Sequence, residues 1–171
     1  YRAERIQNIF YKIANLTITQ HRLDELYRQI FLELKEILEV KNFSIVLRNH
    51  PKEYDFVYRV NEYESSQDHP LTCDVEKLLI DYTFEMGKPM MIYADGILKI
   101  SEQKKQKLKD PLPTIWLGVP IRLDSTKIGV LSISAYDEHS FYNNTDLELL
   151  DFISSQIGLA KERKKNEQNY W

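Results

Sequence analysis

Two runs rich in β-branched and aromatic residues, 114–123 (TIWLGVPIRL) and 127–136 (KIGVLSISAY), are the feature that most restricts the fold. Only Asp124, Ser125 and Thr126 separate them, and a polar connection of this length predicts a β-hairpin. Each run is mostly apolar, which is typical of a strand that is covered on both faces. We therefore expect the two strands to pair antiparallel at the centre of a sheet.

The chain before this hairpin shows helical and then extended patterns. Apolar residues recur at helical spacing over 6–16 and again over 23–38. Two β-branched and aromatic runs follow, 42–48 and 54–60, with turn-forming residues between them. This order predicts two helices followed by a second antiparallel pair of strands.

Three more segments complete the pattern. A third helix is expected from about Asp74 to Gly87, where a glycine followed by Pro89 indicates a left-handed C-cap, and a short strand then runs to Tyr93. A short polar helix is expected to begin at Ser101. The last helix opens with Thr145-x-x-Glu148, the spacing of a capping box, in which each side chain bonds the other residue's backbone amide.

The predicted fold class is α+β, with a central antiparallel sheet of five to six strands and helices on both faces. Strands joined by tight turns favour antiparallel pairing, and the long N- and C-terminal helices are expected to pack together on one face. The 171 residues are 43% hydrophobic and 29% charged, which suffices for one sizeable core.

Net charge and the lengths of apolar runs argue against some partners, and the cysteine content indicates a compartment. The net charge of −3 provides no general attraction to nucleic acid or to an anionic membrane, so we expect neither partner. No run approaches ~18 apolar residues, so no direct membrane insertion is expected. The single cysteine, Cys73, fits a reducing compartment, and we expect a cytoplasmic location, with the cytoplasmic part of a membrane-anchored protein also possible.

The segment 116–165 resembles the C-terminal half of a GAF domain. A strand with Gly118-Val119-Pro120, a strand with Ile128-Gly129-Val130-Leu131 and a helix with Gln156-Ile157-x-x-Ala160 occur in the order found in that family. The segments 75–92 and 23–48 are similar to the family's central helix and to its opening helix with the first strand. The resemblance covers roughly Leu23 to Arg163, and it is strongest to the GAF domains of bacterial sensor histidine kinases.

This resemblance implies a GAF-like, profilin-like fold and a division of the chain into three parts. We expect an N-terminal connector helix over 1–20, the GAF domain over 21–163 and the start of a signalling helix over 164–171. The chain is expected to be excised from a longer protein. A kinase or another effector domain would follow in the same chain, and terminal helices from two chains would form a homodimer.

Strand alternation places a candidate ligand site between the sheet and the central helix. In 127–136, Leu131, Ile133 and Ala135 belong on the face covered by the long helices. The opposite face then carries small hydroxyls and a phenol, and GAF domains hold small ligands there. The candidate pocket residues are Ser44, Tyr93, Trp116, Ser132, Ser134 and Tyr136. The alternative is that these hydroxyls bond to backbone or to water in a filled core.

Other chemistry is weakly indicated. The sequence carries no nucleophile elbow, catalytic triad order or phosphate-binding glycine loop, so no catalytic residue is predicted. His139 stands alone in an acidic loop without a partner at metal-ligand spacing, so no metal or cofactor is predicted either. Tyr142-x-x-x-Asp146 has only part of the pattern of GAF domains that bind cyclic nucleotides.

A lysine-rich run, residues 99–109, reads as a solvated helix over the pocket rather than a phosphate site.

The sequence therefore predicts a non-catalytic sensory or regulatory domain of a bacterial two-component or related signal-transduction protein. It would bind an unidentified small molecule or relay a signal through its terminal helices. A purely structural dimerisation module with a filled pocket is the alternative, followed by a small-molecule enzyme of the same fold.

Overall fold

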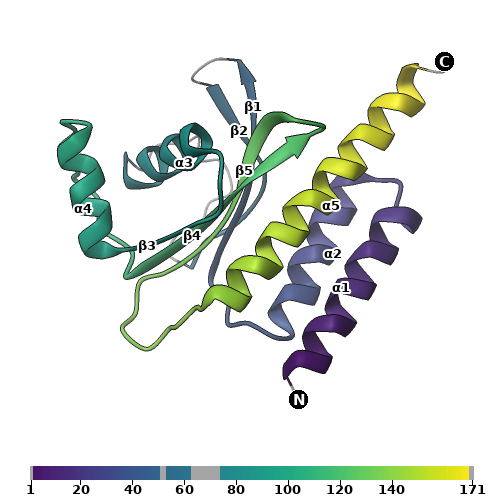
Figure 1. Ribbon diagram of the computed structural model, residues 1–171, viewed down its shortest axis with the longest axis horizontal. Coiled ribbons are helices and arrows are strands. Elements are labelled where there is room, and N and C mark those ends of the chain that lie inside the picture. The colour runs from purple at the N-terminus through teal and green to yellow at the C-terminus, as the bar shows by residue number, and fades with distance from the viewer. Residues whose placement is uncertain (1, 51–52, 63–73, 170–171) are drawn as a thin grey trace.

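One antiparallel sheet separates two layers of helices (Figure 1). The computed structural model describes residues 2–50, 53–62 and 74–169. Its strands lie in the order β2-β1-β5-β4-β3, and every neighbouring pair is antiparallel. Their bounds are β1 Asn42–His50, β2 Glu53–Val60, β3 Met90–Tyr93, β4 Ile115–Leu123 and β5 Thr126–Ala135. The predicted sheet is confirmed.

The predicted hairpin lies near the middle of this sheet. Its turn is shorter than expected, because Thr126 already pairs with Leu123 and leaves Asp124 and Ser125 as the connection. Asp124 has φ 57°, the left-handed conformation that such two-residue turns require.

Three helices cover one face of the sheet. They are α1 Arg2–Thr19, α2 Leu23–Lys35 and α5 Asn144–Asn169, and they lie side by side in Figure 1. The opposite face is covered by α3 Asp74–Met86, while α4 Ala94–Gln103 follows the edge strand β3. The expectation that the long terminal helices share one face is therefore confirmed.

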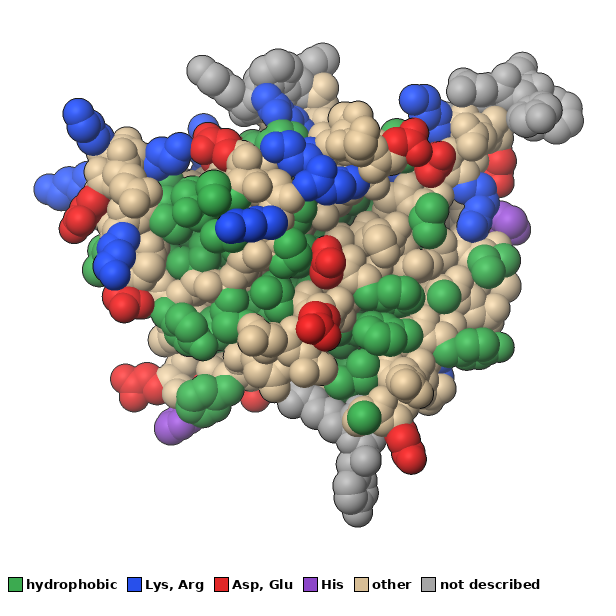
Figure 2. Space-filling model, viewed as in Figure 1, with side chains coloured by type: hydrophobic (Ala, Val, Ile, Leu, Met, Phe, Trp, Pro, Cys, Tyr) green, Lys and Arg blue, Asp and Glu red, His purple; other side chains and the backbone are tan. Residues whose placement is uncertain are grey.

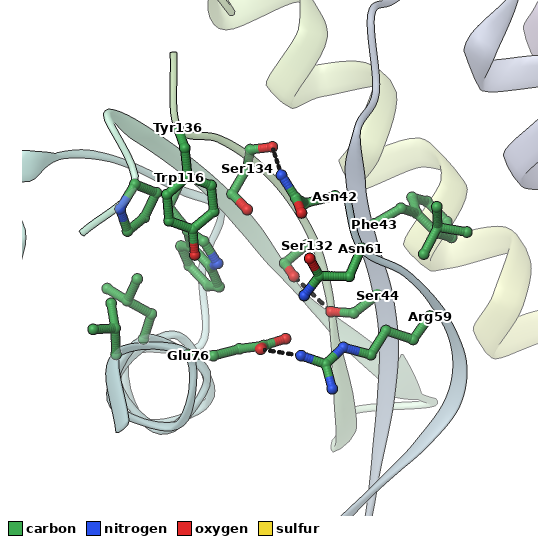
Figure 3. Close-up of a pocket in the computed structure, with 14 residues that line it drawn as sticks. Asn42, Phe43, Ser44, Arg59, Asn61, Glu76, Trp116, Ser132, Ser134 and Tyr136 are labelled. Atoms are coloured by element: carbon green, nitrogen blue, oxygen red, sulfur yellow. Dashed lines mark hydrogen bonds and ion pairs between the residues drawn. The ribbon is translucent and has the colours of Figure 1, made fainter. Parts of the chain in front are cut away.

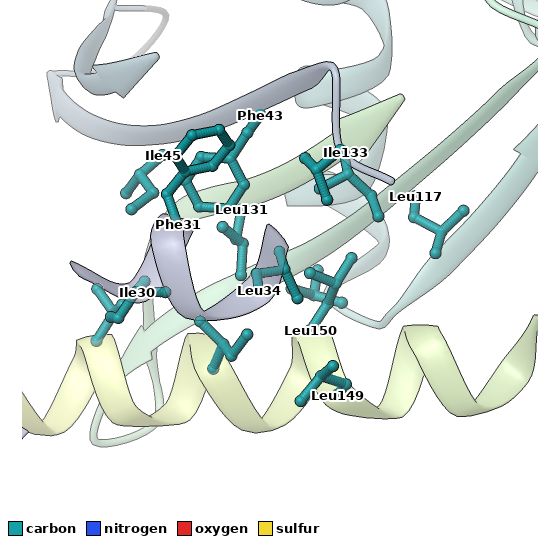
Figure 4. Packing of buried hydrophobic residues seen from close by; sticks show 14 of the residues in the cluster. Ile30, Phe31, Leu34, Phe43, Ile45, Leu117, Leu131, Ile133, Leu149 and Leu150 are labelled. Atoms are coloured by element: carbon teal, nitrogen blue, oxygen red, sulfur yellow. The ribbon is translucent and has the colours of Figure 1, made fainter. Parts of the chain in front are cut away.

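The larger core lies between the three helices and the sheet (Figure 4). Leu131 and Ile133 of β5 are buried there together with Ile30 and Leu34 of α2 and Leu150 of α5. Burying each such side chain stabilises the fold by roughly 1.5–3 kcal/mol. The alternation of β5 thus decides which face the terminal helices occupy.

The smaller core lies beneath α3. Val46 of β1 and Val130 of β5 pack there with Leu79 of α3, Trp116 of β4 and Ile97 of α4. As predicted, α3 ends at a glycine in the left-handed region, Gly87 with φ +66°.

Two predicted helix starts are wrong. Ser101 lies in the last turn of α4, where its hydroxyl donates to the carbonyl of Leu98 at 2.8 Å, because the apolar pair Ile97 and Ile100 starts the helix earlier. The cap of α5 also lies two residues before the predicted one. The side chain of Asn143 accepts from the amide of Asp146 at 3.0 Å, and the carboxylate of Asp146 accepts from the amide of Asn143 at 2.9 Å.

Arg122 of β4 contacts elements on both faces of the sheet. A Cβ at Gly158 of α5 would lie 2.0 Å from the carbonyl oxygen of Arg122, so only glycine permits this close approach. The guanidinium of Arg122 extends to the other face, where it donates to the carbonyl of Gly87 at the end of α3. One residue therefore joins the C-terminal end of α3 to the side of α5.

Candidate functional site

A small cavity lies between the sheet and α3 (Figure 3). Its volume is about 30 Å³, which is room for about two water molecules. Strands β1, β2, β4 and β5 supply most of the wall, and α3 closes it from the other side. The lining residues are Asn42, Phe43, Ser44, Arg59, Val60, Asn61, Val75, Glu76, Leu79, Pro113, Trp116, Ser132, Ser134 and Tyr136.

The floor of the cavity is one row of residues across the sheet. Arg59 of β2 is paired with Ser44 of β1, Ser44 with Ser132 of β5, and Ser132 with Gly118 of β4. Directly opposed residues in neighbouring strands place their side chains on the same face. The row therefore presents a guanidinium and two hydroxyls to the space beneath α3.

The two serine hydroxyls bond to each other. Their oxygens are 2.7 Å apart, and both residues are buried. Each hydroxyl has one proton, and their mutual bond uses only one of the two. The hydroxyl that accepts this bond still has its own proton to donate to an acceptor in the cavity.

Asn42 and Ser134 close the upper side of the cavity as drawn in Figure 3. The amide group of Asn42 donates to the backbone carbonyl of Ser134 at 3.2 Å and to the carboxylate of Glu62 at 3.1 Å, and its oxygen accepts from the amide of Glu62. These three bonds fix the side chain of Asn42, so we assign it a structural role in the cavity wall rather than a role in ligand binding.

Trp116, a candidate pocket residue from the sequence, lies against one side of the cavity. Its indole covers Gly118 so closely that a Cβ there would lie 2.2 Å from the ring. Behind it, the hydroxyl of Thr83 is fully buried and has no hydrogen-bond partner among the described residues. Trp116 thus occupies space that a side chain at position 118 would otherwise need.

An ion pair lies at the rim. The guanidinium of Arg59 donates to the carboxylate of Glu76, in the first turn of α3, at 2.9 Å. The two side chains are 16% and 19% exposed, so water screens them only in part. The guanidinium carbon also lies 4.4 Å from the centroid of the Phe56 ring, within the range of a cation–π contact.

Five of the six predicted site residues meet at this cavity: Ser44, Trp116, Ser132, Ser134 and Tyr136. Tyr93 is not among the lining residues. It lies at the end of the edge strand β3, is 53% exposed, and directs its hydroxyl toward the sulfur of Met91 at 3.7 Å. The structure does not bring Tyr93 to the cavity, because the sequence pattern of a short edge strand does not determine which face of the sheet each of its side chains occupies.

The sequence analysis missed Asn42, Arg59, Asn61 and Glu76. A signal for Arg59 exists, since it is the only charged residue in the second half of β2, where the other residues are apolar or aromatic. Glu76 gave no clear signal of a role at the site. It follows the buried Val75 in the first turn of α3, where an acidic residue is already explained by its favourable interaction with the helix N-terminus.

Other residues that the sequence singled out have structural roles. Tyr142 is buried and donates to the carbonyl of Glu39 at 2.7 Å, and Asp146 caps α5, so neither lines the cavity. The lysine run does not cover the pocket, since no lysine is among its lining residues, and Lys104 pairs with Glu85 at 2.7 Å. Cys73 lies outside the described residues.

The loop after β5 is organised by Asp137. Its carboxylate accepts from the amide and hydroxyl of Ser140, from the amide of His139 and from Lys41. The Ser140 hydroxyl, followed by Lys41, lowers the pKa of Asp137 to about 2. His139 is exposed, and no cluster of His, Cys, Asp or Glu suited to a metal occurs in residues 2–50, 53–62 and 74–169. Within the same residues, no helix has the length and apolar content needed to cross a bilayer.

Comparison with known proteins gives a family match. The sequence model of a family described as "GAF domain" fits residues 20–162. The Nif-specific regulatory protein of Bradyrhizobium diazoefficiens is 22% identical over 86% of this chain, and the formate hydrogenlyase transcriptional activator FhlA of Escherichia coli is 22% identical over 89%. The chain spans only 26% and 22% of the lengths of these two proteins.

Solved structures share the fold. A free methionine-R-sulfoxide reductase from Neisseria meningitidis superposes with a TM-score of 0.70 at 13% identity, covering 95% of this chain and 91% of that one. The GAF domain of a protein described as a sensor histidine kinase, from Pseudomonas syringae pv. tomato, gives 0.63 at 11% identity, covering 99% and 92%. Identities this low establish the architecture alone.

Proposed function

Because the chain belongs to the GAF domain family, we propose that it is a non-catalytic sensory domain that binds a small molecule between the sheet and α3. The observation that carries this proposal is the row of Arg59, Ser44 and Ser132, whose polar side chains converge on one buried cavity. A concave site with a few convergent polar groups is what small-molecule recognition requires.

Native mass spectrometry of the purified chain, before and after incubation with a bacterial metabolite extract, tests this proposal. We expect an added mass from a bound metabolite, and we expect Ser132→Ala to reduce the fraction of protein that carries it. Ser155→Ala is the matched control, because its exposed hydroxyl bonds only within α5, to the carbonyl of Phe152. If no mass binds, or if both variants lose it equally, the sensory proposal fails.

The second candidate function is a structural dimerisation module, and the size of the cavity favours it. About 30 Å³ holds few heavy atoms, and Trp116 is 3% exposed, so the present conformation is nearly filled. A chain that binds nothing in the metabolite experiment but still dimerises would support this function.

An enzyme of the same fold is the third possibility. A reductase shares the architecture, but the sequence of this chain has one cysteine, Cys73, and a single thiol cannot form an intrachain disulfide. The described site also contains no nucleophile beside a general base, so the proposal stays with binding rather than turnover.

We place the domain in a larger cytoplasmic signalling protein of bacterial origin. A sensor histidine kinase is one parent, as the sequence resemblance suggests, and a transcriptional regulator is the other, which the names of the two curated relatives favour. In either parent, α1 and α5 would pair with those of a second copy and pass a change on to the effector domain. Sequencing the gene on both sides of this segment distinguishes the two parents.

A further inference from the structure

The floor of the cavity presents hydrogen-bond donors. Ser44 and Ser132 share one bond and retain one proton, and the guanidinium of Arg59, which is bonded to Glu76, is a charged donor in the same row. Arg59 is directly opposite Ser44 in the β1–β2 register, so these donors belong to one row and face the same space. Converging donors select a ligand that presents acceptor oxygens.

The carboxylate of Glu76 already shows how such an acceptor binds. It reaches across from α3 and accepts from Arg59 at 2.9 Å at the cavity rim (Figure 3). The bond is charge-assisted and only partly exposed, and it joins the edge strand β2 to the first turn of α3. A second carboxylate inside the cavity would compete for the same guanidinium.

We propose that the cavity binds a small carboxylate, which takes the place of the Glu76 carboxylate on Arg59 and accepts the remaining proton of the Ser44–Ser132 pair. This inference rests on the proposed sensory function and specifies the chemical class of its ligand. The cavity volume of about 30 Å³ restricts the ligand to a few heavy atoms unless α3 moves.

The exchange has a structural consequence. When Arg59 binds the ligand, the first turn of α3 loses its ion pair to β2. The C-terminal end of α3 stays attached to β4 through the bond from Arg122 to Gly87. Ligand binding therefore removes one contact between β2 and the first turn of α3, while Asp74 in the same turn still accepts from the amide of Lys109 at 2.7 Å.

Acetate and the neutral, similarly shaped acetamide are the probes. Each is titrated into the 171-residue chain at constant ionic strength, with sodium chloride as the balancing salt, and amide and guanidinium NMR shifts are recorded. We expect saturable shifts at Ser44, Ser132 and Arg59 with acetate, and none with acetamide.

Two substitutions at the rim have opposite expected effects. Arg59→Gln removes the guanidinium and its positive charge and weakens acetate binding by about tenfold or more. Glu76→Gln removes the competing carboxylate and strengthens acetate binding by about tenfold. A purely structural ion pair would make both variants bind more weakly. Glu85→Gln is the control, because its exposed pair with Lys104 is remote from the cavity and its removal should leave binding unchanged.

Equal shifts with acetate and acetamide would overturn the inference, as would weaker binding by Glu76→Gln. If the metabolite experiment captures a neutral or cationic molecule while acetate fails, the sensory function stands and the carboxylate class is wrong. If neither experiment detects binding, the sensory function itself fails.

Discussion

Asn143 and Asp146 cap α5 reciprocally, each side chain accepting from the other residue's backbone amide at 3.0 and 2.9 Å. The first turn of α5 carries the chain from the β5 loop into the larger core, where Leu149 and Leu150 are buried. The cap therefore fixes the entry of the longest helix, and it is Asn143 rather than Thr145 that provides it.

Asn143→Ala should lower the free energy of unfolding by about 1 kcal/mol, since the amide of Asp146 loses its acceptor. Thr145→Ala, the change at the position that the sequence predicts as the cap, should have an effect below about 0.5 kcal/mol. Urea unfolding monitored by circular dichroism measures both. The reverse order would show that Thr145 caps the helix in solution.

Tyr142→Phe should destabilise the fold by about 1 kcal/mol, because the hydroxyl donates to the carbonyl of Glu39 at 2.7 Å inside a buried site. Burial raises the pKa of this phenol well above its ordinary value, so the wild-type hydroxyl keeps its proton throughout the neutral range. Tyr93→Phe, at an exposed tyrosine, is the control and should be neutral. Thermal unfolding of the three proteins gives the comparison.

Asp137 should make stability depend on pH in the acid range. Its pKa in the folded chain is about 2, below the ordinary value of 3.8, mainly because the Ser140 hydroxyl donates to it. A lowered pKa in the folded state means that the stabilisation is complete above about pH 4 and disappears as the pH falls toward 2.

Asp137→Asn should therefore be less stable than the wild type at neutral pH, and the difference should shrink steadily between about pH 4 and pH 2. Urea unfolding at a series of pH values measures this difference. A difference that stays constant across the interval would mean that the carboxylate of Asp137 has the same pKa in both states.

Gly118→Ala should displace the indole of Trp116, because the added Cβ would lie 2.2 Å from the ring. We expect a red-shifted emission from the more exposed indole and a loss of roughly 1–3 kcal/mol in stability. Trp171→Phe provides the background, since it leaves Trp116 as the remaining tryptophan of the sequence. Unchanged emission would show that the sheet, and not the indole, moves to accept the methyl group.

The proposed homodimer predicts where a charge should disrupt it. Figure 2 shows hydrophobic side chains over α5 and α1 on the face turned toward the viewer, and Ile18 and Leu159 are 63% and 49% exposed. Ile18→Glu combined with Leu159→Glu should raise the dimer dissociation constant at least tenfold, an effect of about 1.4 kcal/mol.

Leu98→Glu is the matched control for this charge substitution, because Leu98 is equally exposed, at 49%, but lies on α4. Sedimentation equilibrium distinguishes the variants. A wild-type chain that is monomeric at high concentration, or a control that dissociates as readily as the double variant, would contradict pairing through the terminal helices.

The sheet and its covering helices were predictable because their signals are local and repeated. The alternation of Leu131 and Ile133 with Ser132 assigned each face of β5, and Gly87 marked the end of α3. Helix starts were harder to predict, since Asn143 and Thr145 are both good caps and only the path of the loop chooses between them.

The cavity was predictable in part for the same reason. Ser44 and Ser132 were found because each alternates with apolar residues along its strand, and Trp116 was found as a large aromatic residue on the neighbouring central strand. The ion pair was not, since Arg59 and Glu76 are 17 residues apart and meet only through the packing of α3 against β2. A charged residue on a strand is explained by exposure to solvent, and one in a first helical turn by the helix N-terminus. The sequence therefore does not indicate that Arg59 and Glu76 pair with each other.

The two contacts of Arg122 give the fold a direct mechanical connection between its layers. Its backbone carbonyl touches α5 at Gly158, and its side chain holds the carbonyl that ends α3. A displacement of the end of α3 would therefore reach α5 through the covalent bonds of a single residue. A movement of α3 could therefore shift α5 without a rearrangement of the packed side chains of the core.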